Sequence, residues 1–468
     1  MKITQSSFSR NTFIWLGPVL AVVFTLGLKQ IGLENKPALA AGITLLTVIW
    51  WVSEAIPIAA ASLVPFALLP VFGIVNYKTV SGALGSHVIL LLMGAFMLAK
   101  ALEKSGVHKR LAVYMIRMVG VSSGRRLVFG FMLAAGFLSM WISNTATTLI
   151  MMPIALAILA GIDNPKLRIA LILGIAYASS VGGIGTPIGT PPNVIFMGVY
   201  EELTGKEFSF VQWMRIGVPV VLVSLPIMAL WLTRNVKLEA NIELPQCGPW
   251  RTEERRTLFV FGLTALAWIF RKDPYGGWSG ALDMPLVGDS TIALFAVVVM
   301  FLVPNGKRNA DGQDRLLDWE TARNIPWGLL LLFAGGIAMA KGFTASGLST
   351  MLGDWLSSLA HLPLILMILT ICLVVTYLTE ITSNTATATL LMPILAAAGL
   401  ATGVDPTLFM IPATMAASCA FMLPVATAPN AIAYGLGDIK ISDMVKEGAV
   451  LSFGISVVIG LICYWLLV

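Results

Sequence analysis

Charged residues are scarce in this sequence. Asp, Glu, Lys and Arg make up 12% of its 468 residues, whereas a soluble globular domain contains about 25%. Hydrophobic residues make up 57%, and apolar stretches of about 20 residues, each long enough to cross a bilayer core, recur along the chain. No long soluble domain is left over, so the membrane-embedded part must perform the function.

Cysteine is also scarce, which excludes a disulfide framework. The four cysteines (Cys247, Cys372, Cys419 and Cys463) are scattered and form no CxxC or Cys/His ligand spacing. The net charge is +6, but the Lys and Arg residues cluster in particular loops. This placement indicates membrane orientation rather than nucleic-acid binding.

The apolar stretches predict an all-α integral membrane protein with about eleven transmembrane helices and two re-entrant hairpins. The single spans are predicted at 12–30, 38–53, 56–75, 86–103, 168–200, 212–232, 255–271, 289–303, 326–345, 408–437 and 448–468. Stretches 127–161 and 364–402 are too long for one span, and each has a polar interruption near its middle. They predict hairpins that enter and leave the membrane on the same side.

The loop charges predict the orientation of these spans. Most loop Lys and Arg residues fall in three segments on one side, 100–126, 233–256 and 305–325. The opposite loops contain few of them: 76–85 has Lys78, 201–210 has Lys206, and 346–363 has none. The positive-inside rule therefore predicts a multi-pass protein of the inner (plasma) membrane. Its N-terminus would be cytoplasmic and its C-terminus periplasmic or extracellular.

The chain contains an internal repeat. Three pairs of segments match in order: 94–106 with 335–347, 143–154 with 383–394, and 190–193 with 427–430. The numbers within the pairs differ by 241, 240 and 237. An odd number of predicted crossings separates the copies, so they would face opposite ways. This is an inverted-topology repeat, in which binding sites typically lie near the midplane between the two halves.

Each copy places the tripeptide Ser-Asn-Thr at a hairpin turn, as Ser143-Asn144-Thr145 and Ser383-Asn384-Thr385. Their amides and hydroxyls can bind a carboxylate or, through oxygen, a sodium ion. The alternative role is hydrogen bonding between helices. Downstream, the Gly/Pro-rich segments 182–193 and 423–430 predict broken helices. Their carbonyls would ligate a cation and their half-helix N-termini would face an anion; a structural kink is the alternative.

None of these four segments contains Lys, Arg or His. An anionic substrate would therefore be stabilised by helix N-termini and bound cations, which favours cation-coupled uptake. Glu380 lies three residues before the second tripeptide, and its repeat mate is Met140. We expect Glu380 either to bind a proton or cation or to brace the hairpin.

The paired tripeptides and the paired Thr-x-Pro-Asn breaks resemble the divalent anion/sodium symporter family over nearly the whole chain. The resemblance implies sodium-coupled uptake of C4-dicarboxylates such as succinate, malate and fumarate, by a homodimer with an elevator mechanism. It also implies scaffold and transport domains. The scaffold parts would be 1–124 and 233–363, and the transport halves 125–232 and 364–468.

The resemblance also implies the roles of particular residues. One sodium site would use Ser139, Ser143, Asn144 and the Gly189 carbonyl, and the other Thr379, Ser383, Asn384 and the Ala426 carbonyl. The substrate would contact Asn144, Thr145, Thr190, Asn384, Thr385 and Thr427. Ser139 and Thr379 each precede their tripeptide by four residues, so the repeat supports their pairing. Ala428 replaces a proline found in relatives.

Other transport functions fit the same sequence pattern. A sodium-independent dicarboxylate or tricarboxylate exchanger and a citrate or sulfate symporter share much of this pattern. A channel also uses hairpins and unwound helices. An enzyme is disfavoured, because the candidate segments contain no His, Cys or carboxylate pair for acid-base or metal chemistry.

Overall fold

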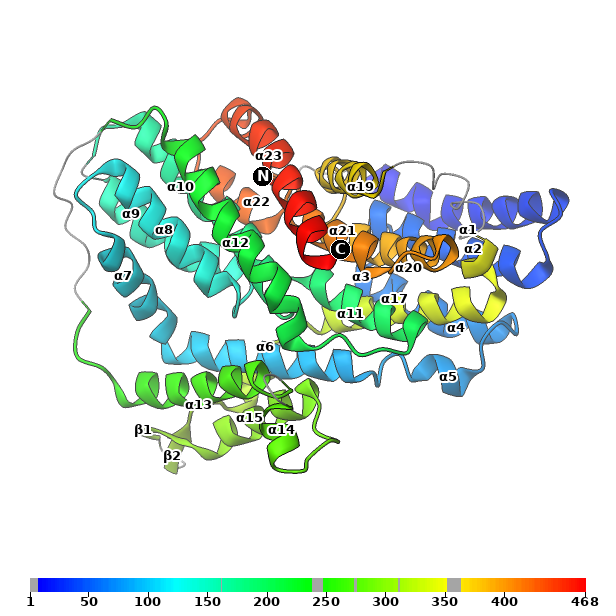
Figure 1. Ribbon diagram of the computed structural model, residues 1–468, viewed down its shortest axis with the longest axis horizontal. Coiled ribbons are helices and arrows are strands. Elements are labelled where there is room, and N and C mark those ends of the chain that lie inside the picture. Colours follow the sequence, from blue (N-terminus) through cyan, green and yellow to red (C-terminus); the bar gives the residue numbers. More distant parts are fainter. Residues whose placement is uncertain (1–6, 161, 238–246, 273–275, 310–311, 352–362) are drawn as a thin grey trace.

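The computed structural model describes residues 7–160, 162–237, 247–272, 276–309, 312–351 and 363–468. Parts of the predicted loops 233–256, 305–325 and 346–363 lie outside these residues. The described chain is mainly helical, as expected (Figure 1). Its longer uninterrupted helices are α1 Ser7–Gln30, α2 Asn35–Ser53, α6 His87–Ser105, α7 Val107–Val119, α12 Phe210–Thr233, α13 Thr252–Ile269, α15 Asp289–Leu302, α17 Trp327–Ser346 and α23 Ile441–Leu467.

Six described helices are long and apolar enough to cross a membrane. They are Asn11–Gln30, Asn35–Ser53, Pro165–Gly185, Phe210–Thr233, Trp327–Ser346 and Ile441–Leu467. Further apolar helices are shorter than a full span. Most belong to the predicted hairpins and broken helices, but Ile58–Val71 and Asp289–Leu302 lie in the predicted single spans 56–75 and 289–303. The protein is therefore a multi-pass membrane protein, while the number of eleven spans stays a prediction.

Both predicted hairpins are helix–turn–helix units. The first consists of α8 Gly124–Ser139 and α9 Asn144–Leu159, and the second of α19 Leu364–Thr379 and α20 Asn384–Thr402. The tripeptides lie where α9 and α20 begin. Ser143 is the N-cap of α9, and its hydroxyl accepts a hydrogen bond from Ala146 N at 3.2 Å.

Both predicted broken helices are also present. The first consists of α10 Pro165–Gly182, the 3₁₀ turn η1 Gly183–Gly185 and α11 Pro191–Thr204. The second consists of α21 Thr407–Ala416 and α22 Ala428–Gly435. Each second half begins with a Thr N-cap followed by proline at N1 or N2, where the missing N–H has no helical partner to lose.

The two halves pack on each other reciprocally. Helix α9 of the first half contacts α22 of the second, and α20 of the second half contacts α11 of the first. In the same way α10 contacts α22, and α21 contacts α11, while α12 contacts α23. Such an exchange of equivalent contacts is what a two-fold relation between the halves produces. Figure 1 shows α6 between these helices and the pair α13 and α15.

Some elements differ from the predicted layout. The predicted span 56–75 is divided into α3 Ile58–Ala61 and α4 Val64–Val71, in a stretch with prolines at 57, 65 and 70. Segment 100–126 contains α7, and segment 305–325 contains a hairpin of β1 Pro304–Asn309 and β2 Gly312–Arg315. Three further short helices are α5 Tyr77–Ser81, α14 Gly277–Ala281 and α16 Trp319–Ala322.

A buried ion pair fastens α7 to the start of α13. Arg110 Nη2 lies 2.9 Å from Glu254 Oε2, and both side chains are almost fully buried. Arg110 also donates to the carbonyls of Gly248 and Pro249. Burial opposes ionisation of Glu254, but hydrogen bonds from the backbone N–H of Arg251 and from the Arg110 guanidinium outweigh it and lower the pKa of Glu254.

We predict that Glu254→Ala lowers the melting temperature of the purified protein, because it leaves the Arg110 charge buried without its partner. Because the folded pKa of Glu254 is depressed, the pair stabilises the fold above the ordinary glutamate pKa. This contribution is lost as the pH falls through the folded pKa.

The matched control is Glu320→Ala, which removes the exposed pair with Arg323 on α16. Thermal unfolding in detergent should show a large loss for Glu254→Ala and almost none for the control. Equal melting temperatures for the two variants at neutral pH would contradict this role of the pair.

Candidate functional site

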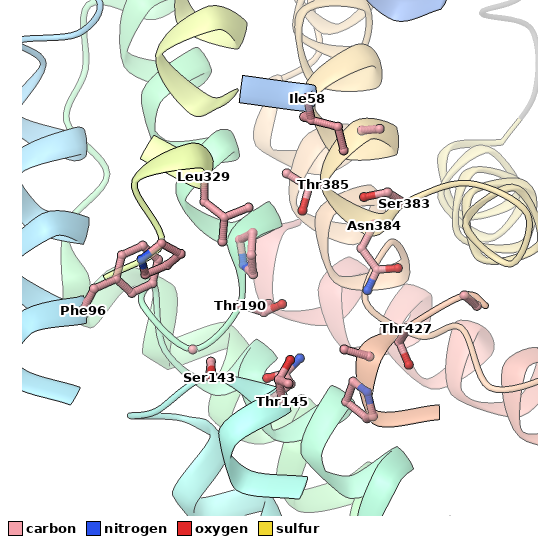
Figure 2. A pocket seen from close by; sticks show the side chains of 18 of the residues that line it. Ile58, Phe96, Ser143, Thr145, Thr190, Leu329, Ser383, Asn384, Thr385 and Thr427 are labelled. Carbon is pink, nitrogen blue, oxygen red and sulfur yellow. The ribbon is translucent and has the colours of Figure 1, made fainter. Parts of the chain in front are cut away.

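A cavity of about 1210 Å³ lies where the two hairpin turns meet the two broken helices. Both tripeptides line it, together with residues 188–191 of the first break and 425–429 of the second. Figure 2 shows the labelled side chains of the two tripeptides around the same space, with Thr190 and Thr427 beside them. The structure therefore brings together four segments that are far apart in the sequence.

Oxygen atoms converge behind the first tripeptide. Ser139 Oγ lies 2.6 Å from Ser179 O and 2.6 Å from Asn144 Oδ1. The same carboxamide position lies 3.2 Å from Gly189 O and 3.1 Å from Ser179 O. With its nitrogen turned inward, Asn144 donates to these oxygens. With its oxygen turned inward, four oxygens face one another, and neutral oxygen atoms of this kind can ligate a desolvated sodium ion.

The second half repeats this arrangement. Thr379 Oγ1 lies 2.8 Å from Asn384 Oδ1 and 3.0 Å from Ala417 O. Its single hydroxyl hydrogen can be donated to only one of these two oxygens. A cation ligated by the oxygens would compensate for the missing donor. Ser139 and Thr379 therefore make equivalent contacts in their two halves.

Glycines allow the first break to approach its hairpin turn. A Cβ on Gly183 would lie 2.6 Å from Asn144 Oδ1 and 3.0 Å from Gly189 O. A Cβ on Gly189 would lie 2.5 Å from Gly183 O and 2.9 Å from Ser139 O. Larger side chains at either position would push the carbonyls away from Asn144.

An asparagine braces each break. Asn193 Nδ2 donates to Gly183 O at 2.9 Å and to Thr186 O at 2.8 Å. Asn430 Nδ2 donates to Ala420 O and to Leu423 O, both at 3.0 Å. These bonds satisfy carbonyls that lost their helical partners. Both asparagines end the Thr-x-Pro-Asn motifs, but a sequence does not show which carbonyls a broken helix frees.

The Glu380 carboxylate braces the second break. Its oxygens accept hydrogen bonds from three consecutive backbone N–H groups, those of residues 421–423, at 2.7–3.1 Å. Ser452 Oγ donates to it at 3.3 Å. In the first half the Met140 carbonyl accepts from the Thr186 hydroxyl instead. Of the two roles expected for Glu380, the contacts favour the brace.

Most predicted site residues line the cavity. Those on its wall are Ser143, Asn144, Thr145, Gly189, Thr190, Ser383, Asn384, Thr385, Ala426 and Thr427. Ser139 and Thr379 lie behind the wall and are fully buried. Among the described residues there is no group of three His, Cys, Asp or Glu side chains that could bind a metal.

The four N-cap residues around the cavity share one chemistry. The hydroxyl residues Ser143, Thr190, Ser383 and Thr427 precede α9, α11, α20 and α22, so four helix N-termini begin at the cavity wall. Thr190 and Ser383 make no side-chain cap bond to their helices. Their hydroxyls are therefore available to a ligand. The positive ends of the helix dipoles favour an anion here.

The charged residues on the cavity wall were not predicted as site residues. They are Glu54, Lys100 and Glu103, all from the first 124 residues. Lys100 Nζ lies 2.7 Å from Glu103 Oε2 on the same helix. Lys100 is the only basic residue on this wall within the described chain. The repeat 94–106/335–347 contains it, but sequence spacing does not show that α6 borders the cavity.

Membrane-length apolar helices, paired hairpins and a polar cavity between two broken helices define a multi-pass membrane transporter rather than an enzyme. Residues 11–468 match the family described as the sodium:sulfate symporter transmembrane region. The chain belongs to this family.

Relatives of known name support this placement. The sodium-dependent dicarboxylate transporter SdcS of Staphylococcus saprophyticus is 42% identical over 474 residues, which cover 96% of this chain and 90% of the relative. SdcS of Staphylococcus aureus is 40% identical over 475 residues, covering 97% and 90%.

Two solved structures share the fold at low sequence identity. The Alcanivorax borkumensis YdaH transporter has a TM-score of 0.59 and is 15% identical, over 83% of this chain and 88% of that one. Neisseria gonorrhoeae MtrF has a TM-score of 0.57 and is 14% identical, over 83% and 82%.

We predict that Glu380→Gln raises the sodium concentration for half-maximal uptake by about tenfold. The new amide NH₂ cannot accept the hydrogen bonds that the backbone N–H groups now donate to the carboxylate. Losing one hydrogen bond to a charged group costs about 1.5–3 kcal/mol. The matched control is Met140→Leu, at the corresponding position of the first half. Sodium titrations of uptake at several pH values test this. Altered pH dependence with unchanged sodium dependence would indicate a proton site instead of a brace.

Proposed function

We propose that the protein takes up C4-dicarboxylates, such as succinate, malate and fumarate, together with sodium ions. The observation that carries this proposal is the pair of matched oxygen clusters behind one anion-compatible cavity. The names of the 40–42% identical relatives, which specify sodium-dependent dicarboxylate transport, support it.

The sodium ions would bind in the two clusters. Asn144 and Asn384 would turn their carboxamide oxygens to the ion, beside Ser139 and Thr379. Ser143 with the Gly189 carbonyl would complete one site, and Ser383 with the Ala426 carbonyl the other. Neutral oxygen ligands suit a hard monovalent cation, and no proton has to be released for binding.

The dicarboxylate would bind between the two clusters. One carboxylate would contact Asn144 and Thr145, the other Asn384 and Thr385, with Thr190 and Thr427 completing the site. The tripeptides and breaks supply no cationic side chain. The anion would be stabilised by the four helix N-termini and by the bound sodium. Each sodium therefore raises the affinity for the anion, which couples the two fluxes.

The transport step would be an elevator movement of a homodimer. The transport halves 125–232 and 364–468 would move together against the scaffold parts 1–124 and 233–363. Reciprocal packing between the halves supports the inverted repeat and a single moving body. The cavity supports this division, since its wall combines both transport halves with residues from both scaffold parts.

We predict that uptake of labelled succinate into reconstituted vesicles stops when external sodium is replaced by choline. The reason is that the two oxygen clusters beside the tripeptides then hold no cation to balance the substrate. Uptake that persists undiminished in choline would contradict sodium coupling.

We predict that Thr145→Ala and Thr385→Ala each raise the apparent Km for the dicarboxylate by roughly tenfold or more. Each removes one hydrogen bond to a charged group, worth about 1.5–3 kcal/mol. Thr257→Ala, a buried threonine on α13 away from the cavity, is the control. Unchanged uptake kinetics in both cavity variants would contradict the substrate assignment.

An exchanger and a citrate or sulfate symporter are the alternatives, and the family description itself names sulfate. Counterflow distinguishes exchange, because an exchanger needs internal dicarboxylate whereas a symporter needs only a sodium gradient. Competition of succinate uptake by citrate and sulfate identifies the preferred anion.

A further inference from the structure

Ionic contacts join α11 to the scaffold at one end of the molecule. Lys341 Nζ on α17 contacts Glu202 Oε2 near the end of α11. Next to it, Glu201 Oε2 lies 3.2 Å from His87 Nε2 at the start of α6. At this end, the Lys341–Glu202 ion pair and the contact between His87 and Glu201 join the proposed transport and scaffold domains.

The cavity reaches the opposite end of the same two scaffold helices. Lys100 and Glu103 near the end of α6 line it, as do Asn324 and Pro326 just before α17. Lys100 keeps 31% of its side chain exposed and pairs with Glu103 of its own helix. The cavity therefore extends to this end, whereas Glu202 and Lys341 at the other end are not on its wall.

Lys100 and Lys341 are equivalent residues of the repeat. They occupy the same position in the matched segments 94–106 and 335–347. Their environments nevertheless differ, because Lys341 is paired with a carboxylate of the proposed transport domain and Lys100 faces the cavity.

A carboxylate is available to pair with Lys100 in the opposite state. Asp438 follows α22, and the numerical difference of 237 that relates the two breaks makes it the counterpart of Glu201, the residue next to Glu202 near the end of α11. Asp438 Oδ2 now lies 3.1 Å from Arg168 Nη1, within the proposed transport domain, and both side chains are 32% exposed. It is therefore accessible for exchange between partners.

We propose that Lys100 and Lys341 are alternating gate residues for the dicarboxylate. When one side is closed, its lysine is neutralised by a transport-domain carboxylate, Glu202 for Lys341 and Asp438 for Lys100. When that side opens, the lysine faces the cavity and attracts the entering or leaving anion. This inference rests on the proposed inverted repeat and elevator movement.

The exchange of partners has two physical consequences. Lys100 is the positive charge that an anion meets on a wall that also carries Glu54 and Glu103. Salt screens its attraction for the anion over a Debye length of about 10 Å at 0.1 M. Moreover, Lys100 and Asp438 exchange partners, since in this state they pair with Glu103 and Arg168. Neither state is then strongly favoured by charge.

Paired cysteines test the exchange. In a Cys247→Ser background, in which the remaining cysteines are buried, one protein combines Glu202→Cys with Lys341→Cys and a second combines Lys100→Cys with Asp438→Cys. A third protein contains all four substitutions. A short bifunctional thiol reagent is applied in vesicles, and linked peptides are identified by mass spectrometry.

We predict that each pair becomes linked, that each link stops uptake, and that the two links exclude each other in the protein with four cysteines. Both links in one molecule would contradict the gate. So would failure of the 100/438 pair to link in a protein that transported before treatment.

Kinetics of Lys100 variants provide a second test. Lys100→Gln should raise the dicarboxylate Km from the side to which Lys100 opens, keep kcat, and differ less from wild type at high salt. Lys100→Arg should retain the wild-type Km. If Lys100→Gln leaves the Km unchanged while uptake stays sodium-dependent, the gate is contradicted but the proposed function is not. Loss of sodium dependence in the wild-type protein contradicts the proposed function.

Discussion

Two helices of this protein are interrupted inside the apolar body, and each interruption frees backbone groups that have no water to bind. Side chains satisfy these groups in both halves. Asn193 and Asn430 donate to the freed carbonyls, Glu380 accepts from freed N–H groups, and Trp213 Nε1 donates to Ile184 O at 2.7 Å. The breaks are thereby held in fixed conformations, which is what a binding site made of backbone carbonyls requires.

The helix N-termini at the cavity wall supply the positive charge that an anion needs. Helix N-termini at Ser143, Thr190, Ser383 and Thr427 provide partial positive charge without a lysine or arginine. A permanent cation at the centre would bind the anion in the absence of sodium and weaken coupling. The lysine on the wall, Lys100, belongs to the proposed scaffold and is paired with Glu103. Fixed charge is therefore kept at the mouth, away from the tripeptides.

Much of the candidate site could be predicted from the sequence, because each motif of the site occurs once in each half of the chain. The family resemblance implied Ser139 and Thr379, and their equal spacing to the tripeptides supported the pairing. The glycines and prolines showed where the helices break. The brace formed by Glu380 could not be derived, since its partners lie 41 to 43 residues away. The hairpin of β1 and β2, the helix α7 and the wall residue Lys100 were missed for a related reason. Their placement depends on packing between distant segments, which local composition does not encode.

The central claim is that sodium bound to the two oxygen clusters makes the cavity favourable for a dicarboxylate. Equilibrium binding of labelled succinate to the purified protein tests it most directly, because it separates binding from movement. The account predicts that succinate affinity rises with sodium concentration and that succinate raises sodium affinity by the same factor. Equal succinate affinity in sodium and in choline would contradict it.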